Sequence, residues 1–299
     1  LCAAMRGWVA PMLVRPLNHP ADLAGLIALL DRCELHDGRP SLCEHKYASL
    51  VAERLSGDGF VAEDDGDVIG YVHLLESKRP GTYELEVVVH PAQRGRLEGQ
   101  LLRAAIERVR DYGGETVMAW VYQAGGERPL EELGFSLEKT LHQMRVPLPT
   151  PKPEWAGLDL RGFTPRDEQA MLYVNNRAFE GHLEAGNWGP EDLRARQAYD
   201  WYDPEGIRML WSGDDLVAFC WTKQHPGRLG EIYLIAVDPD LRGRGFGRTA
   251  ALEGLRHLHL RGSTEGMLSV DGANDRARQL YQQLGFAWHP SDLAFGLQL

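Results

Sequence analysis

Apolar residues recur at helical spacing and in short alternating runs along the first half of the chain. The spacing predicts helices over 23–33 and 47–55, followed by a β-hairpin whose turn is Asp64-Asp65-Gly66-Asp67. The strands and helices expected next are a strand at 85–89, a helix at 101–109, a strand at 117–121, a short helix at 130–133 and a closing strand at 141–146. This pattern is typical of a sheet covered by helices.

A proline-rich segment follows, with four prolines in the seven residues from Pro147 to Pro153. Proline fixes φ and has no N–H, so alternate prolines continue neither a helix nor a central strand. We therefore predict a stiff linker. The expected domains are residues 1–146 and 156–299, with 147–155 between them.

The same order of elements returns after the linker. The expected elements are helices at 167–179, 190–201 and 274–284, and strands at 209–212, 216–223, 232–237 and 266–270. Val89-His90-Pro91 matches Val237-Asp238-Pro239 at an offset of 148, and Leu133-Gly134-Phe135 matches Leu284-Gly285-Phe286 at an offset of 151. We interpret this as a duplication: two tandem α/β (α+β) domains, each with a mixed, mostly antiparallel sheet and flanking helices.

Residues 232–249 carry the clearest chemical signal. A β-branched strand ends at Pro239, three glycines follow (Gly243, Gly245 and Gly247), and an apolar helical pattern begins. A strand, a glycine-rich turn and a helix N-terminus together direct backbone N–H groups at one point, which favours a pyrophosphate. The alternative is an ordinary βα turn. The lysine of a P-loop is missing, and a dinucleotide fold fits poorly.

Arg242, Gly245 and Gly247 match the pattern Arg/Gln-x-x-Gly-x-Gly/Ala, and Val237-Asp238-Pro239 precedes it. This stretch resembles the acetyl-CoA loop of the GNAT acyltransferase superfamily. The resemblance implies an N-acetyltransferase that uses acetyl-CoA as co-substrate and needs no metal. The residues expected to bind acetyl-CoA are Ile235, Ala236, Val237, Arg242, Gly243, Arg244, Gly245, Phe246, Gly247, Arg248, Asn274 and Arg278.

The first copy of this loop is altered. It reads Arg94-Gly95-Arg96-Leu97-Glu98-Gly99, so Leu97 replaces the central glycine and Glu98 places a negative charge where a phosphate would bind. Leu130 stands at the position that corresponds to Tyr281. We therefore expect one active site, in the second half, and a scaffold or acceptor wall in the first.

Transfer of an acetyl group from a thioester to an amine needs a base, oxyanion donors and an acid for the leaving thiolate. The last predicted helix carries Tyr281, a candidate acid that resembles the tyrosine of the GNAT helix; a core tyrosine is the alternative. Glu231 opens the central strand and is the candidate base. A backbone N–H near Val237, in a bulged strand, is the expected oxyanion donor. His182 and His225 rank lower as bases.

The second half also resembles the mycothiol synthases, a tandem-domain family within this superfamily. The matching stretches include 174–179, 201–204, 221–223 and 230–233. The resemblance implies that the primary amine of a cysteinyl-glucosaminyl-inositol is acetylated. The residues expected to contact this acceptor are Glu44, Glu184, Lys223, Glu231, Ser269 and Asp271.

Two positions depart from that family, because Ser269 and Asp271 stand where mycothiol synthases tend to have Tyr and Glu. The acidic acceptor residues also suit a polycation, so an aminoglycoside antibiotic is the alternative acceptor, which would make the chain a resistance enzyme. A protein acetyltransferase and an idle acyl-CoA sensor are less favoured. A sensor would need neither Glu231 nor Tyr281.

Net charge, apolar content and cysteine spacing limit the kinds of binding partner and the cellular compartment that we expect. The chain has a net charge of −11, which argues against nucleic acid and suits a cationic small molecule. No apolar run approaches the ~20 residues of a membrane helix, and residues 1–13 are too short and weak for a secretory signal. Four cysteines without paired spacing fit a reducing cytosol. We expect a cytoplasmic monomer or weak dimer.

Overall fold

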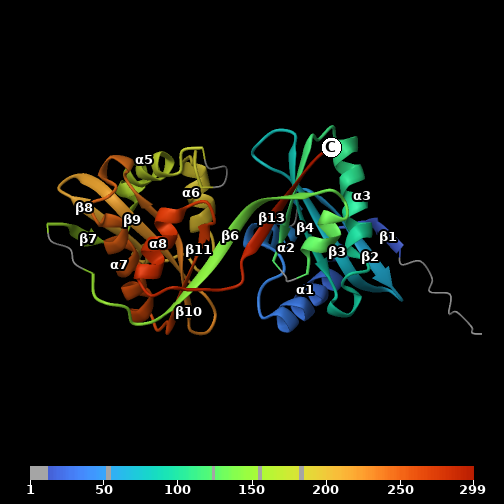
Figure 1. The fold of residues 1–299 in the computed structure, drawn as a ribbon, viewed down its shortest axis with the longest axis horizontal. Coiled ribbons are helices and arrows are strands. Elements are labelled where there is room, and N and C mark those ends of the chain that lie inside the picture. The colour runs from blue at the N-terminus through green and yellow to red at the C-terminus, as the bar shows by residue number, and fades with distance from the viewer. Residues whose placement is uncertain (1–12, 52–54, 123–124, 154–156, 182–184) are drawn as a thin grey trace, which may run out of the picture. The chain divides into compact units, whose positions relative to one another are not determined.

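The computed structural model describes residues 13–51, 55–122, 125–153, 157–181 and 185–299. The chain divides into two compact units (Figure 1). The first unit runs up to Thr140 and also takes in Asp292–Leu299, and the second is Leu141–Ser291. Each unit is a mixed sheet with helices packed against it, so the predicted fold class is confirmed.

In the first unit the strand order is β1-β2-β3-β4-β5-β13. Its strands are β1 (Leu13–Pro16), β2 (Asp58–Asp64), β3 (Asp67–Glu76), β4 (Thr82–Val89), β5 (Thr116–Val121) and β13 (Asp292–Gln298). Its helices are α1 (Leu23–Asp37), α2 (Glu44–Val51), α3 (Glu98–Asp111) and α4 (Glu127–Glu131), with a 3₁₀ turn η1 (Pro91–Gln93). Strands β4 and β5 pair in parallel, and the other described pairs of this sheet are antiparallel.

In the second unit the order is β6-β11-β10-β9-β8-β7, and β12 pairs with β6. Its strands are β6 (Ser136–Pro147, which starts in the first unit), β7 (Asp159–Arg161), β8 (Ile207–Ser212), β9 (Asp215–Gln224), β10 (Leu229–Val237), β11 (Glu265–Asp271) and β12 (Ala287–Trp288). Its helices are α5 (Glu168–Ala178), α6 (Pro190–Gln197), α7 (Phe246–Leu260) and α8 (Asp275–Gln283), with 3₁₀ turns η2 (Pro165–Asp167), η3 (Pro204–Gly206) and η4 (Pro239–Leu241). Strands β10 and β11 pair in parallel.

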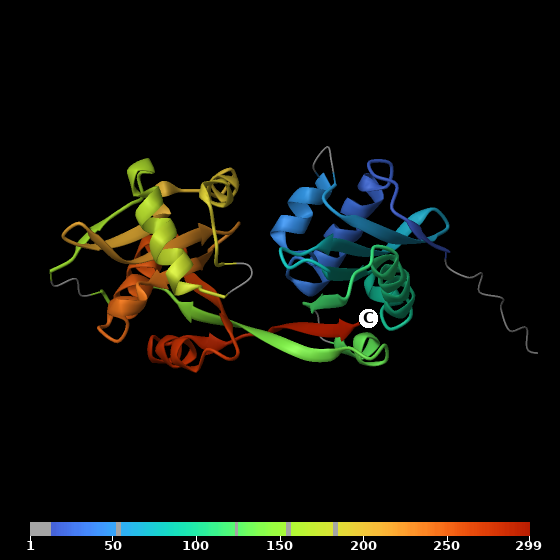
Figure 2. The ribbon, with the colours of Figure 1, turned by 90° about the horizontal axis from the view of Figure 1, so that it is seen from above.

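Two apolar clusters hold the second sheet between its helices. Side chains of α7 and α8 pack with Ile232 and Leu268 on one face, and side chains of α5 and α6 pack with Phe219 and Trp221 on the other. Figure 2 shows the helices of this unit around its strands. Helix α7 lies so close to β9 that a Cβ at Gly254 would stand 2.3 Å from the sulfur of Cys220. The glycine therefore lets α7 approach the sheet closely.

The strands that close the two sheets differ from the prediction. Residues 141–147 of β6 pair with β11 and so belong to the second unit, whereas the unpredicted strand β13 pairs with β5 and completes the first. The units therefore do not follow the predicted boundaries at 146 and 156. Alternating apolar residues determine which face of a strand is buried, but they do not select its partner in space.

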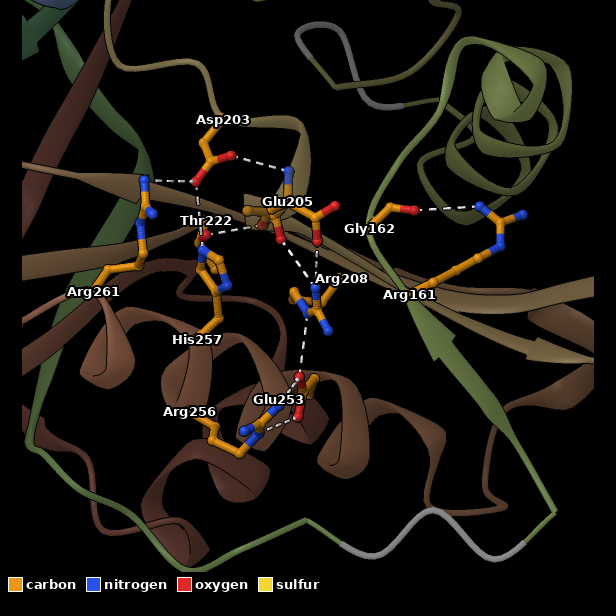
Figure 3. Close-up of polar contacts among 11 residues, drawn as sticks. Arg161, Gly162, Asp203, Glu205, Arg208, Thr222, Glu253, Arg256, His257 and Arg261 are labelled. Carbon is orange, nitrogen blue, oxygen red and sulfur yellow. Dashed lines mark hydrogen bonds and ion pairs between the residues drawn. The ribbon is translucent and has the colours of Figure 1, made fainter.

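A buried ionic cluster fixes helix α7 against the sheet (Figure 3). Glu253 of α7 is 0% exposed and accepts hydrogen bonds from Arg208 of β8 at 3.2 Å and from Arg256 at 2.8 Å. Nearby, Arg261 at the end of the helix pairs with Asp203 at 3.3 Å. Because a buried carboxylate is tolerated only when it is fully paired, these contacts fix the position of α7.

The ionised carboxylate of Asp167 makes the stability of the second unit depend on pH. Its carboxylate accepts hydrogen bonds from Arg161 at 2.6 Å and from the Thr164 backbone at 2.7 Å, and these bonds lower its pKa from 3.8 to about 2. A lowered pKa stabilises the fold above pH 3.8, and that contribution is lost as the pH falls towards 2. Asp167→Asn should therefore reduce the free energy of unfolding by about 1–2 kcal/mol at pH 7.

Urea unfolding followed by tryptophan fluorescence, between pH 7 and pH 3, tests this expectation. The difference between wild type and Asp167→Asn should shrink steadily below pH 4. Asp159→Asn, a change of an exposed aspartate on β7, is the matched control. A difference that is independent of pH would show that Asp167 does not contribute through its ionised form.

Candidate active site

Strands β10 and β11 separate part-way along the second sheet. Their parallel pairing runs from Leu229 opposite Glu265 to Ile232 opposite Leu268, although β10 continues to Val237 and β11 to Asp271. Strand β10 stays paired with β9 along its other edge. The two strands therefore diverge and leave a V-shaped opening in the sheet beside the second half of β10.

A β-bulge lies just before this opening. Ile232 pairs with Thr222 and Leu234 pairs with Trp221, so Tyr233 is the additional residue of β10. A bulge bends its strand and redirects the side chains that follow. The predicted position of the bulge and of its oxyanion donor is near Val237. The register shift lies earlier, at Tyr233, and Val237 pairs regularly with Ala218.

The glycine turn, residues 242–248, connects β10 to α7 through η4. Gly243 and Gly245 have φ of 87° and 89°, a left-handed conformation that residues with a Cβ rarely adopt. Gly245 is the N-cap of α7, and no side chain caps the first N–H groups of this 15-residue helix. Its first turn contains no acidic residue. This arrangement is suited to a phosphate group, because the free N–H groups and the helix dipole both favour an anion.

Most side chains of the glycine turn are exposed. Arg244 and Arg248 extend to the surface, while Arg242 donates a hydrogen bond to the Ala178 carbonyl at 3.0 Å. The turn itself is anchored by Asp238, which accepts hydrogen bonds from Arg177 at 2.8 Å and from the Asp240 N–H at 2.9 Å. Ile235, Ala236 and Val237 lie on the part of β10 that has left β11, and Phe246 and Gly247 begin α7.

Two predicted cofactor residues on α8 have other roles as well. Asn274 is the N-cap of α8, and its side-chain oxygen accepts a hydrogen bond from the Ala277 N–H at 3.1 Å. Arg278 pairs with Asp275 and lies over the ring of Trp288 at 6.0 Å. Both residues help to fold α8, and their contact with a cofactor stays a prediction.

One face of the second sheet gathers several of the predicted acceptor residues. Glu231 lies directly opposite Lys223 of β9 on one side and Met267 of β11 on the other. Ser269 and Asp271 follow Met267 at alternate positions of β11, so their side chains point to the same face as Glu231. Ser269 is exposed and Asp271 is half-buried.

An aromatic group borders this face. The ammonium group of Lys223 lies 4.9 Å from the ring centre of Trp201, and Trp201 packs on Tyr233 with ring centres 4.9 Å apart. Neither Trp201 nor Tyr233 is among the site residues predicted from the sequence. The signal that could have found them is their place in the stretches 201–204 and 230–233, which resemble the mycothiol synthases.

Glu44 and Glu184 are the two further predicted acceptor residues. Glu44 is the first residue of α2, in the first unit, and it is half-buried. Glu184 and His182 fall outside the described residues, so the structure gives no position for them.

Glu231 and His225 form a close pair. The two side chains meet at 2.7 Å, between His225 Nε2 and Glu231 Oε2. The carboxylate of Glu231 is 17% exposed and the imidazole 27%. The structure therefore brings the candidate base, Glu231, into contact with a lower-ranked candidate, His225.

Tyr281 lies on the opposite face of the sheet, among the side chains of α7 and α8. Its ring is 6% exposed and packs on Phe286 with ring centres 5.7 Å apart. Burial, together with the nearby Cys220, raises the pKa of the phenol well above its usual value. The hydroxyl is therefore protonated at neutral pH, as a proton donor must be.

The first unit differs from the second in the loop before α3 and in strand β4, which correspond to the glycine turn and to β10. Glu98 lies in the first turn of α3, and its Oε1 accepts a hydrogen bond from the Gly95 N–H at 3.0 Å. A side-chain carboxylate thus occupies the place that a phosphate would take. Strands β3 and β4 pair without a register shift from Gly70–Val89 to Glu76–Tyr83, so β4 is not bulged there.

Polar side chains also fill the sheet face of the first unit. Lys46 and Glu86, 2% and 1% exposed, pair at 2.7 Å, and Glu86 also accepts hydrogen bonds from the Tyr122 hydroxyl at 2.9 Å and the Cys43 N–H at 2.8 Å. The cavity beside Glu98 and β5 measures about 40 Å³. A space of this size is too small for a pantetheine chain.

The described part of the chain shows neither a metal site nor a membrane helix. Within the described residues, no three or more His, Cys, Asp or Glu side chains are grouped so that they could hold a metal ion. No helix there is long and apolar enough to cross a bilayer.

Residues 26–134 and 170–286 each match the model of the acetyltransferase (GNAT) family. The chain therefore belongs to the GNAT acetyltransferase family, and it is an acyltransferase with two GNAT domains in tandem. Its relatives include mycothiol acetyltransferases. That of Thermomonospora curvata is 40% identical over 283 residues, which cover 91% of this chain and 93% of the relative. That of Thermobispora bispora is 39% identical over 289 residues, 92% of this chain and 96% of the relative.

Solved structures agree on the fold. A GCN5-related N-acetyltransferase from Sphaerobacter thermophilus superimposes with a TM-score of 0.77 at 23% identity, over 96% of this chain and 95% of its own. A tandem GNAT protein from the clavulanic acid biosynthesis pathway gives a TM-score of 0.72 at 18% identity, over 96% and 98%. At these identities the likeness establishes the tandem fold alone.

Proposed function

We propose that the chain is an acetyl-CoA-dependent N-acetyltransferase that acts on the primary amine of an amino-sugar glycoside, as mycothiol synthases do. The observation that carries this proposal is the similarity to mycothiol acetyltransferases, 40% identical across nine-tenths of both chains. The expected acceptor is a cysteinyl-glucosaminyl-inositol. The second unit would carry out the reaction.

The proposed acetyl-CoA site follows from the opening in the second sheet. The N–H groups at the start of α7 and the exposed Arg244 and Arg248 would hold the pyrophosphate. The edge of β10 from Leu234 to Val237 has left β11, so its backbone groups would bind the pantetheine arm in the manner of a neighbouring strand. Acetyl-CoA supplies the thioester that is broken in the reaction.

The chemical roles divide between the two faces of the sheet. Glu231 would take a proton from the acceptor's ammonium group, which frees the amine to attack the thioester carbonyl. A backbone N–H on the open edge of β10, near Val237, would stabilise the oxyanion. Tyr281 would give its proton to the departing thiolate. Glu231 and Tyr281 lie on opposite faces of the sheet. Because β10 and β11 separate, both side chains would reach the same thioester through the opening between these strands.

The acceptor would lie on the face that carries Glu231 and Lys223. Trp201 and Tyr233 provide aromatic rings there, and an aromatic ring packs well against the apolar face of a sugar. Ser269 and Asp271 offer a hydroxyl and a carboxylate to sugar or inositol hydroxyls. Glu44 and Glu184 stay predicted acceptor contacts.

A thiol-release assay tests the acceptor. The purified chain is incubated with acetyl-CoA and either a cysteinyl-glucosaminyl-inositol or a set of aminoglycosides, and free CoA is measured, with products identified by mass spectrometry. We expect turnover on the first acceptor only. Turnover on aminoglycosides alone would replace the proposed acceptor by the alternative one. No turnover on either would refute an amino-sugar glycoside as substrate.

Calorimetric titration tests how many sites bind acetyl-CoA. We expect one molecule per chain, because Glu98 occupies the anion position of the first unit and its cavity measures only about 40 Å³. Arg244→Glu should weaken binding about 10- to 100-fold, the loss of a charge-assisted phosphate contact. Arg96→Glu, the matched change in the first unit, should have no effect. Two bound molecules per chain would show that the first unit is open.

A further inference from the structure

In the contact between His225 and Glu231, the histidine is the hydrogen-bond donor and the carboxylate is the acceptor. An ionised carboxylate can only accept hydrogen bonds, so the hydrogen of the 2.7 Å contact must be on His225 Nε2. This holds whether the imidazole is neutral or charged. The bond occupies Oε2 of Glu231 and leaves Oε1 for another partner.

The hairpin between β9 and β10 fixes both side chains. His225 follows Gln224, the last residue of β9, and its N–H donates a hydrogen bond to the Leu229 carbonyl at 3.0 Å, which closes the hairpin. Gly227, with φ of 82°, makes the turn. Glu231 lies two residues beyond Leu229 on β10. Since so short a connection joins them, the position of the imidazole relative to the carboxylate is set locally.

Two other charged groups on this face make contacts of their own. Lys223 faces Glu231 from β9, and its ammonium group lies over Trp201. Arg145 of β6 stands in the same row of the sheet, beyond Met267, and donates a hydrogen bond to Glu265 of β11 at 3.0 Å. His225 makes a direct side-chain contact with the candidate base, at 2.7 Å.

We propose that His225 is a positioning residue for Glu231: its Nε2–H holds the carboxylate in one orientation, with Oε1 directed at the acceptor amine. This inference rests on the proposed function of Glu231 as the base. A glutamate side chain has three rotatable bonds, so a fixed donor on one oxygen removes much of its freedom. The imidazole itself does not take the amine proton.

Three substitutions separate the hydrogen bond from the shape of the ring. His225→Ala and His225→Leu remove the donor and should lower kcat about 10- to 100-fold, the usual loss for a hydrogen bond to a charged group. The KM for acetyl-CoA should not change. His225→Gln restores an N–H donor on a side chain of similar length and should recover most of the activity. Equal losses in all three variants would overturn the positioning role.

A double-mutant cycle shows whether His225 acts through Glu231. In a Glu231→Gln background the change His225→Ala should cost almost nothing, because there is no carboxylate to orient. Fully additive losses would overturn the proposal. His259→Ala, a histidine of α7 bonded to a backbone carbonyl, is the matched control. If Glu231→Gln is fully active, the proposed base is wrong; if only His225→Ala is fully active, the proposed positioning is wrong.

Nuclear magnetic resonance provides a readout that needs no acceptor. In a ¹H–¹⁵N spectrum of the histidine side chains, the Nε2–H of His225 should appear as a slowly exchanging, strongly downfield proton, because it is bound to a carboxylate. The signal should move upfield in Glu231→Gln. A His225 Nε2–H that exchanges rapidly in the wild type would show that the contact is not maintained in solution.

Discussion

Glu231→Gln should lower kcat about 100- to 1,000-fold, the range expected when a general base is removed. Glutamine has the same shape, so it preserves the strand and the contact with His225, but it cannot take a proton from the acceptor. The KM for acetyl-CoA should change little, because the glycine turn lies at the other end of β10. Steady-state kinetics with the cysteinyl-glucosaminyl-inositol acceptor measures both constants.

A neighbouring carboxylate gives the control for this prediction. Glu265 lies at the start of β11, at an alternate position to Met267, and so shares the face of Glu231. Its partner is Arg145. Glu265→Gln should leave kcat unchanged. The limb of the pH–rate profile that reports the base should disappear in Glu231→Gln; an unchanged profile would assign the base to another group.

Tyr281→Phe should lower kcat about 100-fold while the KM for the acceptor stays near its original value. The substitution keeps the ring and its packing on Phe286, and it removes only the hydroxyl. Because burial raises the pKa of Tyr281, the wild-type phenol stays protonated throughout the assay range, so the loss should be similar at every pH.

Two measurements guard against a structural explanation of that loss. The thermal midpoint of Tyr281→Phe should lie close to that of the wild type, because Tyr281 contributes to the cluster of α7 and α8 mainly through its ring. Tyr173→Phe, a change at an exposed tyrosine of α5, is the control for the loss of a hydroxyl. Unchanged turnover in Tyr281→Phe would remove this residue from the reaction.

The two units show how a duplicated fold can keep one candidate site. In the second unit, uncapped N–H groups begin α7 and β10 is bulged and separated from β11. In the first, Glu98 binds the Gly95 N–H, and Lys46 and Glu86 fill the sheet face. In the first unit, charged side chains of the protein thus occupy the positions that correspond to the candidate site of the second unit.

Local patterns in the sequence determined most of the elements. Helices α1, α3, α5, α7 and α8 and strands β2–β5 and β8–β11 lie where apolar spacing predicted them, with ends that differ by a few residues. The glycine turn was predictable for the same reason, since positive φ at Gly243 and Gly245 is a property of single residues and their neighbours. The substitution of Glu98 was likewise visible from the repeat.

Only the tertiary structure decided which strands pair, where β10 is bulged, and that His225 contacts Glu231. Strand β13 begins at Asp292 and completes the first unit, although its partner β5 ends 171 residues earlier, at Val121. Such pairings depend on the packing of whole sheets, which a single sequence pattern does not encode. The sequence alone thus determined the elements and the candidate residues, whereas the packing of the sheets decided which of those residues meet.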